Sequence, residues 1–385
     1  MKKSLAILMA MALVFVGAGC SQSGEGTAAS SESGKPVQES EASTSAEATA
    51  AGEETKAAPE DGKVLKIGMS IPVTSAVYWT GAGYGVQKAV EELNAEAGKT
   101  VAEFQFFDPG AFDLQTQLKN IEDAMALEFD GMVIAPVDAD GTVNAIDMAY
   151  DNGMPIFTID LDANTDAILA GFCTFNYNAG CTNAETMAEL IKAKNGAYEG
   201  KVAMVMGYAT VSSHVARCQG FRETMEEKYP DIEIVFEEFS GKPEEDLRVS
   251  ENALAMYGKD LDAIFVTGDT AANSACQAVD DAGLMKPVGD PEHIIIVGFD
   301  GEAQGIENIR AGRQDATVAQ NPIAMGYNAT MALVDYLRTG VEPKTDTEDR
   351  LIEVAHLAIT KENLDTAEAQ EFLWADIVSK ADLDF

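Results

Sequence analysis

Short apolar runs alternate with longer amphipathic segments from residue 64 to residue 311. The runs contain five to ten residues and are rich in β-branched side chains, which is typical of strands buried on both faces. They predict strands at 64–73, 101–107, 131–135, 154–159 and 166–172, and then at 201–206, 232–239, 261–267 and 294–299. Between the runs, apolar residues recur mostly at spacings of three and four, as in an amphipathic helix. This spacing predicts helices at 80–96, 113–128, 140–151, 178–194, 214–228, 244–257, 271–282 and 302–311.

This order of elements predicts an α/β fold with two Rossmann-like, doubly wound parallel-sheet domains. Strands joined by helices of this length lie parallel, with helices on both faces of the sheet. The series begins twice, and about 320 residues exceed one hydrophobic core. In open parallel sheets, ligands bind beyond the carboxyl ends of the strands, so we expect the ligand in a cleft between the domains. The loops at those ends are polar and aromatic with few cations, which favours a neutral hydroxylated ligand over a phosphate or carboxylate.

The N-terminus has a different pattern. Lys2 and Lys3 precede an apolar run from Leu5 to Val16, which is too short to span a bilayer. Small residues then lead into Cys20, and the whole resembles a bacterial lipoprotein signal, in which cleavage leaves a lipid-modified cysteine as the new N-terminus. We expect residues 1–20 to be this signal peptide and Cys20 to anchor the chain outside the cytoplasm, on the bacterial cell membrane. An ordinary secretory leader is the alternative, and it also exports the chain.

Residues 21–61 are mostly Ser, Glu, Ala, Gly and Thr and contain no aromatic side chain. Such a composition buries too little apolar surface to offset the entropy of ordering, so it predicts a disordered acidic tether. The leader carries +2 and the tether −7, so the total of −38 leaves −33 on residues 62–385. A surface of that charge repels phosphate backbones, and we expect no nucleic-acid partner.

Four cysteines follow Cys20, namely Cys173, Cys181, Cys218 and Cys276. Export permits a disulfide, and the sequence leaves open Cys173–Cys181, Cys181–Cys218 or buried free thiols. The chain has no Cys-x-x-Cys or paired His–Cys spacing. We therefore expect no metal and no cofactor.

Two strings resemble known motifs incompletely. Residues 81–85 have the glycines of a dinucleotide fingerprint, but the third glycine comes one residue early. Residues 160–166 have the alternating oxygens of a calcium loop, but Thr165 replaces the glycine at the sixth position and Gly171 the glutamate at the twelfth. Neither string supports a cofactor site.

Five short motifs carry a family resemblance. They are Asp130–Asp138, Met154–Asp160, Arg217-x-x-Gly220-Phe221, Val297–Gly301 and Thr317–Gln320. In this order they resemble the type I periplasmic binding proteins, specifically the ribose- and galactose-type sugar-binding subunits of ABC importers, over roughly residues 63–357. The resemblance implies two lobes joined by three hinge crossings near residues 173, 320 and 352, which close on the ligand. The implied lobes are 63–173 plus 321–351 and 174–320 plus 352–385.

The resemblance also implies roles for individual residues. Tyr78 and Trp79 match an aromatic pair that stacks on a sugar face. Asp160 and Asp300 match carboxylates that accept sugar hydroxyl protons from opposite lobes, and Gln320 matches a hinge amide. Structural roles are the alternative, as core aromatics for the first pair and as loop or capping residues for the carboxylates.

Some positions depart from the ribose-type pattern. Leu161 stands where that pattern has an arginine, directly after the Asp160 position, and Val215 aligns with a second arginine. His214 and Arg217 are the nearest substitutes, so both are candidate ligand contacts. This loss argues against ribose as the ligand.

Asp138 and Asp269 complete the candidate set. Both follow predicted strands, where a carboxylate either contacts a ligand or caps a turn. Residues 358–385 extend past the matched region, and their apolar side chains predict a helix or wrap on the second domain.

The sequence thus predicts a monomeric, lipid-anchored solute-binding protein that captures a small sugar or sugar-like ligand and delivers it to an ABC permease and ATPase complex. The alternative is an anchored sensor that presents its closed form to a chemoreceptor or histidine kinase. An enzyme fits poorly, because only His214 of the three histidines lies in a predicted cleft loop and no Gly-x-Ser-x-Gly elbow accompanies it.

Overall fold

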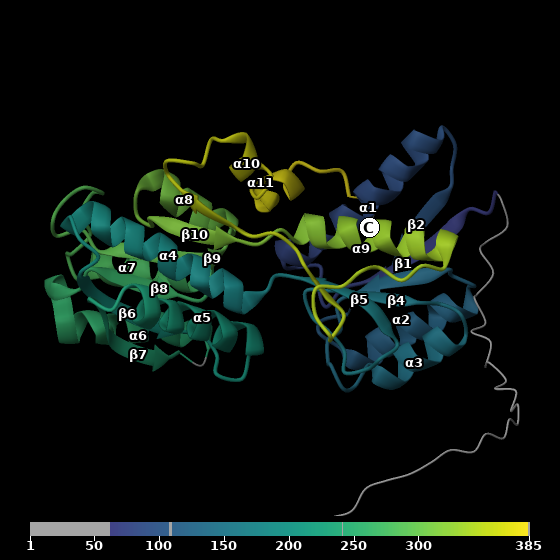
Figure 1. The fold of residues 1–385 in the computed structure, drawn as a ribbon, viewed down its shortest axis with the longest axis horizontal. Helices are drawn as coiled ribbons and strands as arrows, with labels where there is room; N and C mark the ends of the chain where they lie inside the picture. Colours follow the sequence, from purple (N-terminus) through teal and green to yellow (C-terminus); the bar gives the residue numbers. More distant parts are fainter. Residues whose placement is uncertain (1–61, 108–109, 241, 384–385) are drawn as a thin grey trace, which may run out of the picture. The chain divides into compact units, whose positions relative to one another are not determined.

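A computed structural model describes residues 62–107, 110–240 and 242–383 of the chain. Within them the chain forms two six-stranded sheets (Figure 1). The first sheet has the strand order β11-β5-β4-β3-β1-β2, and its neighbouring strands pair in parallel. Its strands are β1 (Leu65–Ser70), β2 (Ala102–Phe106), β3 (Gly131–Ile134), β4 (Ile156–Ile159), β5 (Ile168–Cys173) and β11 (Leu351–Glu353).

The second sheet repeats this topology in the order β12-β10-β9-β8-β6-β7. Its pairs are parallel except that β12 runs antiparallel to β10. The strands are β6 (Gly200–Met206), β7 (Ile232–Phe239), β8 (Ala263–Val266), β9 (Ile295–Asp300), β10 (Ala316–Ala319) and β12 (Leu357–Thr360). Apart from the added strands β11 and β12, both sheets have the 2-1-3-4-5 order of a doubly wound fold, and the predicted fold class is confirmed.

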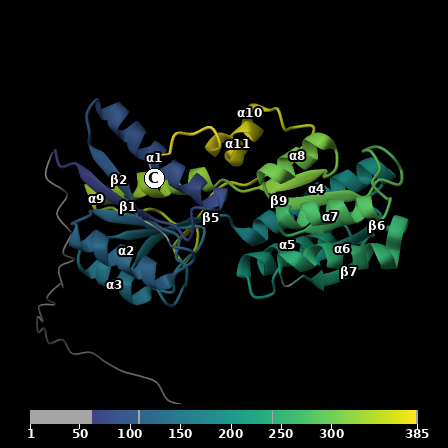
Figure 2. The same ribbon diagram turned by 180° about the vertical axis from the view of Figure 1, so that it is seen from behind.

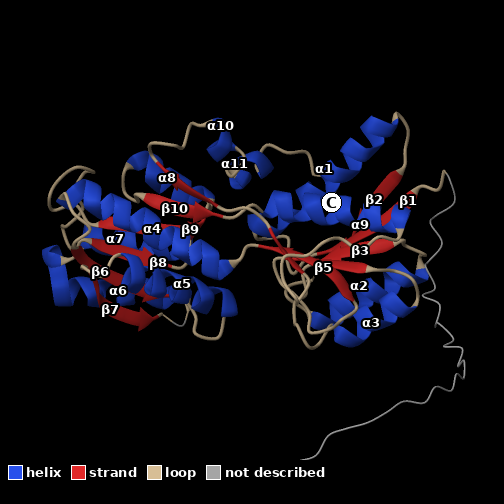
Figure 3. Ribbon diagram, viewed as in Figure 1, coloured by secondary structure: helices blue, strands red, loops and turns tan. Residues whose placement is uncertain are grey.

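Helices cover both faces of the first sheet (Figure 3). One face buries its apolar side chains under α1 (Val77–Ala97) and α9 (Pro322–Thr339), and the other under α2 (Leu114–Ala126) and α3 (Val143–Asp151). Helices α1 and α9 approach each other closely at Gly85, where a Cβ atom would lie 2.0 Å from the carbonyl oxygen of Ile323. Gly85, the last glycine of the string at residues 81–85, therefore serves helix packing.

The second sheet is covered in the same way. Helices α4 (Asn176–Asn195) and α5 (Ser212–Lys228) pack on one face, and α6 (Pro243–Tyr257) and α7 (Asp269–Asp281) pack on the other. The short η1 turn (Gly258–Asp260) follows α6, and α8 (Ala303–Ala311) follows β9. The strands between these layers are buried on both faces, which explains their continuous apolar runs.

The chain passes between the two sheets at three places within the described residues. These lie between β5 and α4, between β10 and α9, and between β11 and β12. Ile352 and Glu353 pair with Phe172 and Cys173 of β5. These two residues therefore belong to the first sheet, because their backbone pairs with strand β5. The sequence had placed residues from 352 onward in the second lobe.

The C-terminal segment contacts both halves of the molecule. Leu364, Phe372 and Leu373 join an apolar cluster with Ile306 and Ile359 near the second sheet. Helix α10 (Ala367–Gln370) comes next, and helix α11 (Trp374–Val378) after it lies beside α1 of the first half. Helices α10 and α11 are drawn in yellow between α8 and α1 in two opposite views (Figures 1 and 2). The predicted wrap on the second domain is thus incomplete, because α11 also finds an apolar partner on α1.

The predictions for the N-terminus and for the cysteines concern features other than the two sheets. The signal peptide, Cys20 and the tether lie outside the described residues. The cysteines at 173, 181, 218 and 276 are free thiols in this structure. Among the described helices, none is long and apolar enough to cross a membrane.

Candidate functional site

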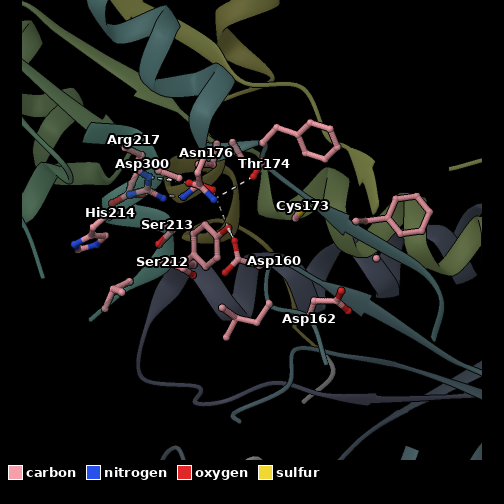
Figure 4. A pocket seen from close by; sticks show the side chains of 18 of the residues that line it. Asp160, Asp162, Cys173, Thr174, Asn176, Ser212, Ser213, His214, Arg217 and Asp300 are labelled. Atoms are coloured by element: carbon pink, nitrogen blue, oxygen red, sulfur yellow. Dashed lines mark hydrogen bonds and ion pairs between the residues drawn. The ribbon is translucent and has the colours of Figure 1, made fainter. Parts of the chain in front are cut away.

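A cavity of about 580 Å³ is lined by residues that follow strands of both sheets (Figure 4). Its volume lies in the range of small-molecule sites. The structure brings together at this cavity the predicted residues Tyr78, Trp79, Asp160, His214, Arg217, Asp300 and Gln320. The two other candidates, Asp138 and Asp269, are not among its lining residues.

The aromatic pair lies in the first turn of α1. The helix begins at Val77, three residues before the predicted start, so Tyr78 and Trp79 are helical rather than part of a loop. Their rings meet edge to face with centroids 5.1 Å apart, and Trp79 is 8% exposed. The hydroxyl of Tyr78 donates a hydrogen bond of 2.7 Å to Oδ1 of Asp160. Burial and the neighbouring Asp160 raise the pKa of the Tyr78 phenol well above its usual value, so the phenol stays a donor at neutral pH.

Asp160 and Asp300 occupy equivalent positions after β4 and at the end of β9. Both have backbone conformations in the left-handed region, with φ of 59° and 97°. Non-glycine residues rarely adopt this region, and such strain concentrates at functional sites. Burial raises the pKa of Asp160, against the opposing hydrogen bond from Tyr78 and the charge of Arg217. The two carboxyl groups therefore project from the ends of two different parallel sheets into one cavity.

Arg217 provides the guanidinium of the cavity. Its Nε donates to Oδ1 of Asn176 at 2.8 Å, and its Nη1 donates to Oδ1 of Asp300 at 3.3 Å (Figure 4). The same Nη1 also donates to the carbonyl oxygen of Thr267 at 2.8 Å. The guanidinium also lies 3.6 Å above the ring centroid of Phe299. With its side chain 5% exposed, Arg217 is a cation fixed in one orientation beside Asp300.

The position of Arg217 depends on the close contact of α4 with α5. A Cβ atom at Gly180 would lie 2.2 Å from the carbonyl oxygen of Arg217, and one at Gly220 would lie 2.1 Å from that of Tyr177. Any larger side chain would push the two helices apart. The glycine of the Arg217-x-x-Gly220 motif is therefore explained by helix packing beneath the cavity.

Gln320 joins the groups of the two halves. Its Nε2 donates to Oδ1 of Asp300 at 2.8 Å. Its Oε1 lies 3.4 Å from the hydroxyl of Tyr78 and shares that hydroxyl's single proton with Asp160. It is 3% exposed and lies directly after β10, at the second crossing of the chain. Asp160, Tyr78, Gln320, Asp300 and Arg217 thus form one continuous hydrogen-bonded chain.

His214 is a neutral donor of the cavity. Its Nδ1 accepts a hydrogen bond of 3.0 Å from the amide of Tyr208, whose ring lies 5.0 Å from the imidazole. Burial, together with the charge of Arg217, lowers the pKa of His214 to about 4. At neutral pH the ring is uncharged and carries its proton on Nε2.

Asp269 lies beneath the site. Its Oδ2 accepts hydrogen bonds from the amides of Gly301 at 3.0 Å and Glu302 at 2.9 Å, and its Oδ1 accepts from Gln314 at 2.8 Å. The residue is fully buried, and burial raises its pKa well above the usual value. Asp269 therefore holds the loop that presents Asp300.

Asp138 forms a surface turn. Its Oδ1 accepts from the amides of Asp140 at 3.1 Å and Gly141 at 2.6 Å, and its side chain is exposed. This is the Asx-turn geometry of a residue that shapes the approach to a helix, here α3.

The cavity includes residues that the candidate set omitted. Asn176 follows the first crossing, and Ser212 and Ser213 begin α5 after the loop that follows β6. In the sequence, these three residues could have been found by their position directly after a crossing or after a loop that follows a strand. Leu161 also lines the cavity, so the side chain that replaces the ribose-type arginine reaches the site.

The charge of the cavity is mainly negative. Among the described residues that line it, one carries a guanidinium and four carry carboxyl groups, namely Asp160, Asp162, Asp300 and Glu302. Burial raises the pKa of Glu302, whose Oε2 accepts a hydrogen bond from Thr270. Such a lining favours ligands that donate hydrogen bonds and disfavours anions.

The side chains of the calcium-like string at residues 160–166 form hydrogen bonds with other residues of the protein. Asp162 accepts a hydrogen bond of 3.0 Å from Thr158, and Asn164 donates one of 2.6 Å to Asp140. Within the described ranges, no group of three His, Cys, Asp or Glu side chains is placed to hold a metal ion.

Known proteins resemble this chain over most of its length. A family model described as a periplasmic binding protein domain matches residues 67–341. The xylitol-binding protein of Mycolicibacterium smegmatis is 26% identical over 268 residues, which cover 68% of this chain and 71% of that protein. The ribose import binding protein of Bacillus subtilis is 27% identical over 283 residues, which cover 74% and 85%. A solved sugar-binding protein of a sugar ABC transporter from Bacillus halodurans has a TM-score of 0.66 and 26% identity, and covers 78% of this chain and 98% of its own.

Proposed function

This chain belongs to the periplasmic binding proteins, and on that premise we propose that it is a lipid-anchored extracytoplasmic receptor for a small sugar or polyol. It captures the ligand by hinge closure and delivers it to an ABC importer. The family members it resembles are sugar-binding transport proteins and not enzymes. The observation that carries the proposal is the hydrogen-bonded chain of the cavity, which runs from Asp160 through Gln320 to Arg217.

The composition of the cavity supports a neutral polyhydroxylated ligand. Hydroxyl groups donate to carboxylates such as Asp160, which accepts a hydrogen bond from Tyr78 on Oδ1. The C–H faces of a sugar or the carbon chain of a polyol suit the rings of Tyr78 and Trp79. A phosphorylated sugar or a sugar acid would bring a negative charge beside an acidic lining, which costs binding free energy.

The residues of the cavity favour a ligand other than ribose, although a ribose import binding protein is among the relatives. A polyol and a pentose appear in the names of two relatives. Leu161 replaces the arginine of the ribose-type pattern with an apolar side chain in the cavity. A ligand that presents fewer hydroxyl groups on that side satisfies this lining better, because a hydroxyl facing leucine would lose its hydrogen bonds. We therefore place ribose behind neutral ligands that present a C–H surface to Leu161.

The three crossings between the sheets support hinge closure. Each proposed lobe contains one sheet. The first lobe consists of residues 63–173 and 321–353, and the second of residues 174–320 and 354–385. Asp160 belongs to the first lobe and Asp300 to the second, so a ligand that bonds to both favours the closed state.

Isothermal titration calorimetry of the purified chain against pentoses, hexoses and polyols tests the proposal. One neutral ligand should bind in the micromolar range or tighter, while its phosphate ester and its sugar acid bind at least about tenfold more weakly, a difference of about 1.4 kcal/mol. Asp300→Asn should weaken binding, and Asp138→Asn is the matched control outside the cavity. Absence of binding across all neutral carbohydrates would contradict the proposal.

Importer and sensor roles differ in their membrane partner. Cells that lack the protein should lose uptake of the radiolabelled ligand, and restoring the chain should restore uptake. Unchanged uptake with a lost transcriptional or chemotactic response to the ligand would instead support the alternative, an anchored sensor.

A further inference from the structure

Trp374 of α11 contacts two residues of the site without lining the cavity. Its Nε1 donates a hydrogen bond of 3.0 Å to the backbone carbonyl oxygen of Asp300. Its ring meets the ring of Tyr78 edge to face, with centroids 5.6 Å apart and an angle of 89°. The indole is 2% exposed. The buried side chain of Trp374 thus contacts both Tyr78 of the first half and Asp300 of the second.

The backbone around Asp300 is shaped to receive this indole. Gly301 has a φ of 77°, and a Cβ atom there would lie 2.5 Å from Cβ of Ala319 and 3.4 Å from Nε1 of Trp374. The carbonyl oxygen of Asp300 accepts a second hydrogen bond of 3.1 Å from the backbone N–H of Gln320. With two donors on one oxygen, the peptide that follows Asp300 is held in a single orientation.

The segment that carries Trp374 is attached on both sides. Toward the second half, Phe372 and Leu373 lie in the apolar cluster near β10 and β12, and Arg310 pairs with Asp376 at 3.1 Å. Toward the first half, Nε2 of Gln87 in α1 donates a hydrogen bond of 3.1 Å to the carbonyl oxygen of Asp382. Val378 also lies against α1, where a Cβ atom at Gly81 would be 3.5 Å from its Cγ2.

The segment also meets the hinge. Nδ2 of Asn321, directly after Gln320, donates a hydrogen bond of 3.3 Å to the carbonyl oxygen of Glu371. The chain therefore returns to the first half beside its second crossing. Besides the three crossings, residues 371–382 are a further physical connection between the lobes.

We propose that Trp374 is a positioning residue for ligand binding, which holds the Asp300 peptide and the Tyr78 ring in their binding geometry from behind the cavity. The inference rests on the proposed function, because it assigns Trp374 to the same ligand site. A tryptophan that only fills the core would contribute to stability alone. The positioning role adds a contribution to ligand affinity and to the order of the Asp300 loop.

Trp374→Phe separates these roles. Phenylalanine keeps an aromatic ring beside Tyr78 and removes the Nε1–H donor to Asp300. The loss of one hydrogen bond of about 1 kcal/mol predicts roughly five-fold weaker binding of the ligand found by calorimetry. Phe372→Leu is the matched control, because Phe372 is a buried ring of the same segment that lies in the apolar cluster. It should lower the melting temperature and leave the affinity at the wild-type value.

A second readout needs no ligand, so failure of the proposed function and failure of this inference are distinguishable. In hydrogen–deuterium exchange of the full chain, Trp374→Phe should speed exchange several-fold in peptides covering residues 298–303 and 76–82. Phe372→Leu should leave both peptides at wild-type rates. Wild-type exchange in both peptides of Trp374→Phe, or an equal increase in the two variants, overturns the positioning role even if no sugar binds.

Discussion

The hydroxyl of Tyr78 donates a hydrogen bond of 2.7 Å to Oδ1 of Asp160, which joins the first turn of α1 to the end of β4. The two residues are 82 positions apart in the chain. Because the carboxyl ends of β1 and β4 lie at the same edge of the sheet, the loops that follow them meet. The bond thus fixes an aromatic ring and a carboxylate relative to each other before a ligand enters.

Tyr78→Phe should weaken ligand binding by about tenfold, because a carboxylate in a buried site loses its charge-assisted donor. Without that donor the pKa of Asp160 rises further, since the hydrogen bond from Tyr78 opposes the effect of burial. Calorimetric titrations at several pH values check both effects. The matched control is Tyr177→Phe, which removes a hydroxyl that donates to Glu223 outside the cavity. Equal affinities of Tyr78→Phe and wild type would contradict a binding role for this pair.

Arg217→Lys should reduce ligand affinity and the free energy of unfolding together. Lysine cannot donate to Asn176, Thr267 and Asp300 at once from a planar group, nor stack on Phe299 in the same way. We expect a loss of about 1–3 kcal/mol in stability, measured by urea denaturation, because buried acceptors lose partners.

Arg222→Lys is the control for that variant, since Arg222 lies on the same helix and pairs with Glu237 at a partly exposed site. Partly exposed ion pairs contribute about 0–1 kcal/mol, so its stability should change little and its affinity not at all. If both substitutions have the same effect, Arg217 has no special place in the site.

His214→Gln should change the pH dependence of stability. The pKa of His214 is lowered to about 4 in the folded protein, so the unfolded chain binds more protons between that value and its ordinary pKa of about 6.5. The wild type therefore loses stability relative to the glutamine variant as the pH falls from about 7 to about 4. Thermal unfolding of both proteins across this range measures the difference. A constant difference would show that His214 titrates normally.

His293 provides a contrast of opposite sign. Burial lowers the pKa of His293, but its hydrogen bond to Asp315 and the charge of that residue outweigh this effect and raise the pKa above the ordinary value. Its contribution is present below the ordinary pKa and is lost as the pH rises through the folded value. Relative to His293→Gln, the wild type should thus lose stability at rising rather than falling pH.

Cys20→Ala should release the protein from the membrane. If Cys20 carries the lipid, its removal leaves a tether without an anchor, and the protein should move from the membrane fraction to the soluble extracytoplasmic fraction. Immunoblots of fractionated cells measure this distribution. Cys181→Ala is the control, because this thiol lies in the folded domain. Retention of Cys20→Ala in the membrane fraction would argue for a different attachment.

The strands of both sheets could be predicted because parallel strands buried on both faces leave continuous apolar runs, as in β3 and β8. The start of α1 could not, because Tyr78 and Trp79 follow a polar loop and the helix has no side-chain cap at Ala76. Asp160 and Asp300 could be named from motifs at strand ends. Their left-handed conformations could not be predicted, because the fold around them holds that strain.

By itself, the sequence determined the fold class, the edge of each sheet at which a site is expected, and seven of the residues that line the cavity. These depend on periodicity and on short motifs, which are local properties of the chain. Only the tertiary structure decided that Asp269 supports the site from below, that Gln320 links Tyr78 to Asp300, and that Trp374 lies behind both. Each of these contacts joins segments that are distant in the sequence, and their proximity depends on the packing of the whole chain.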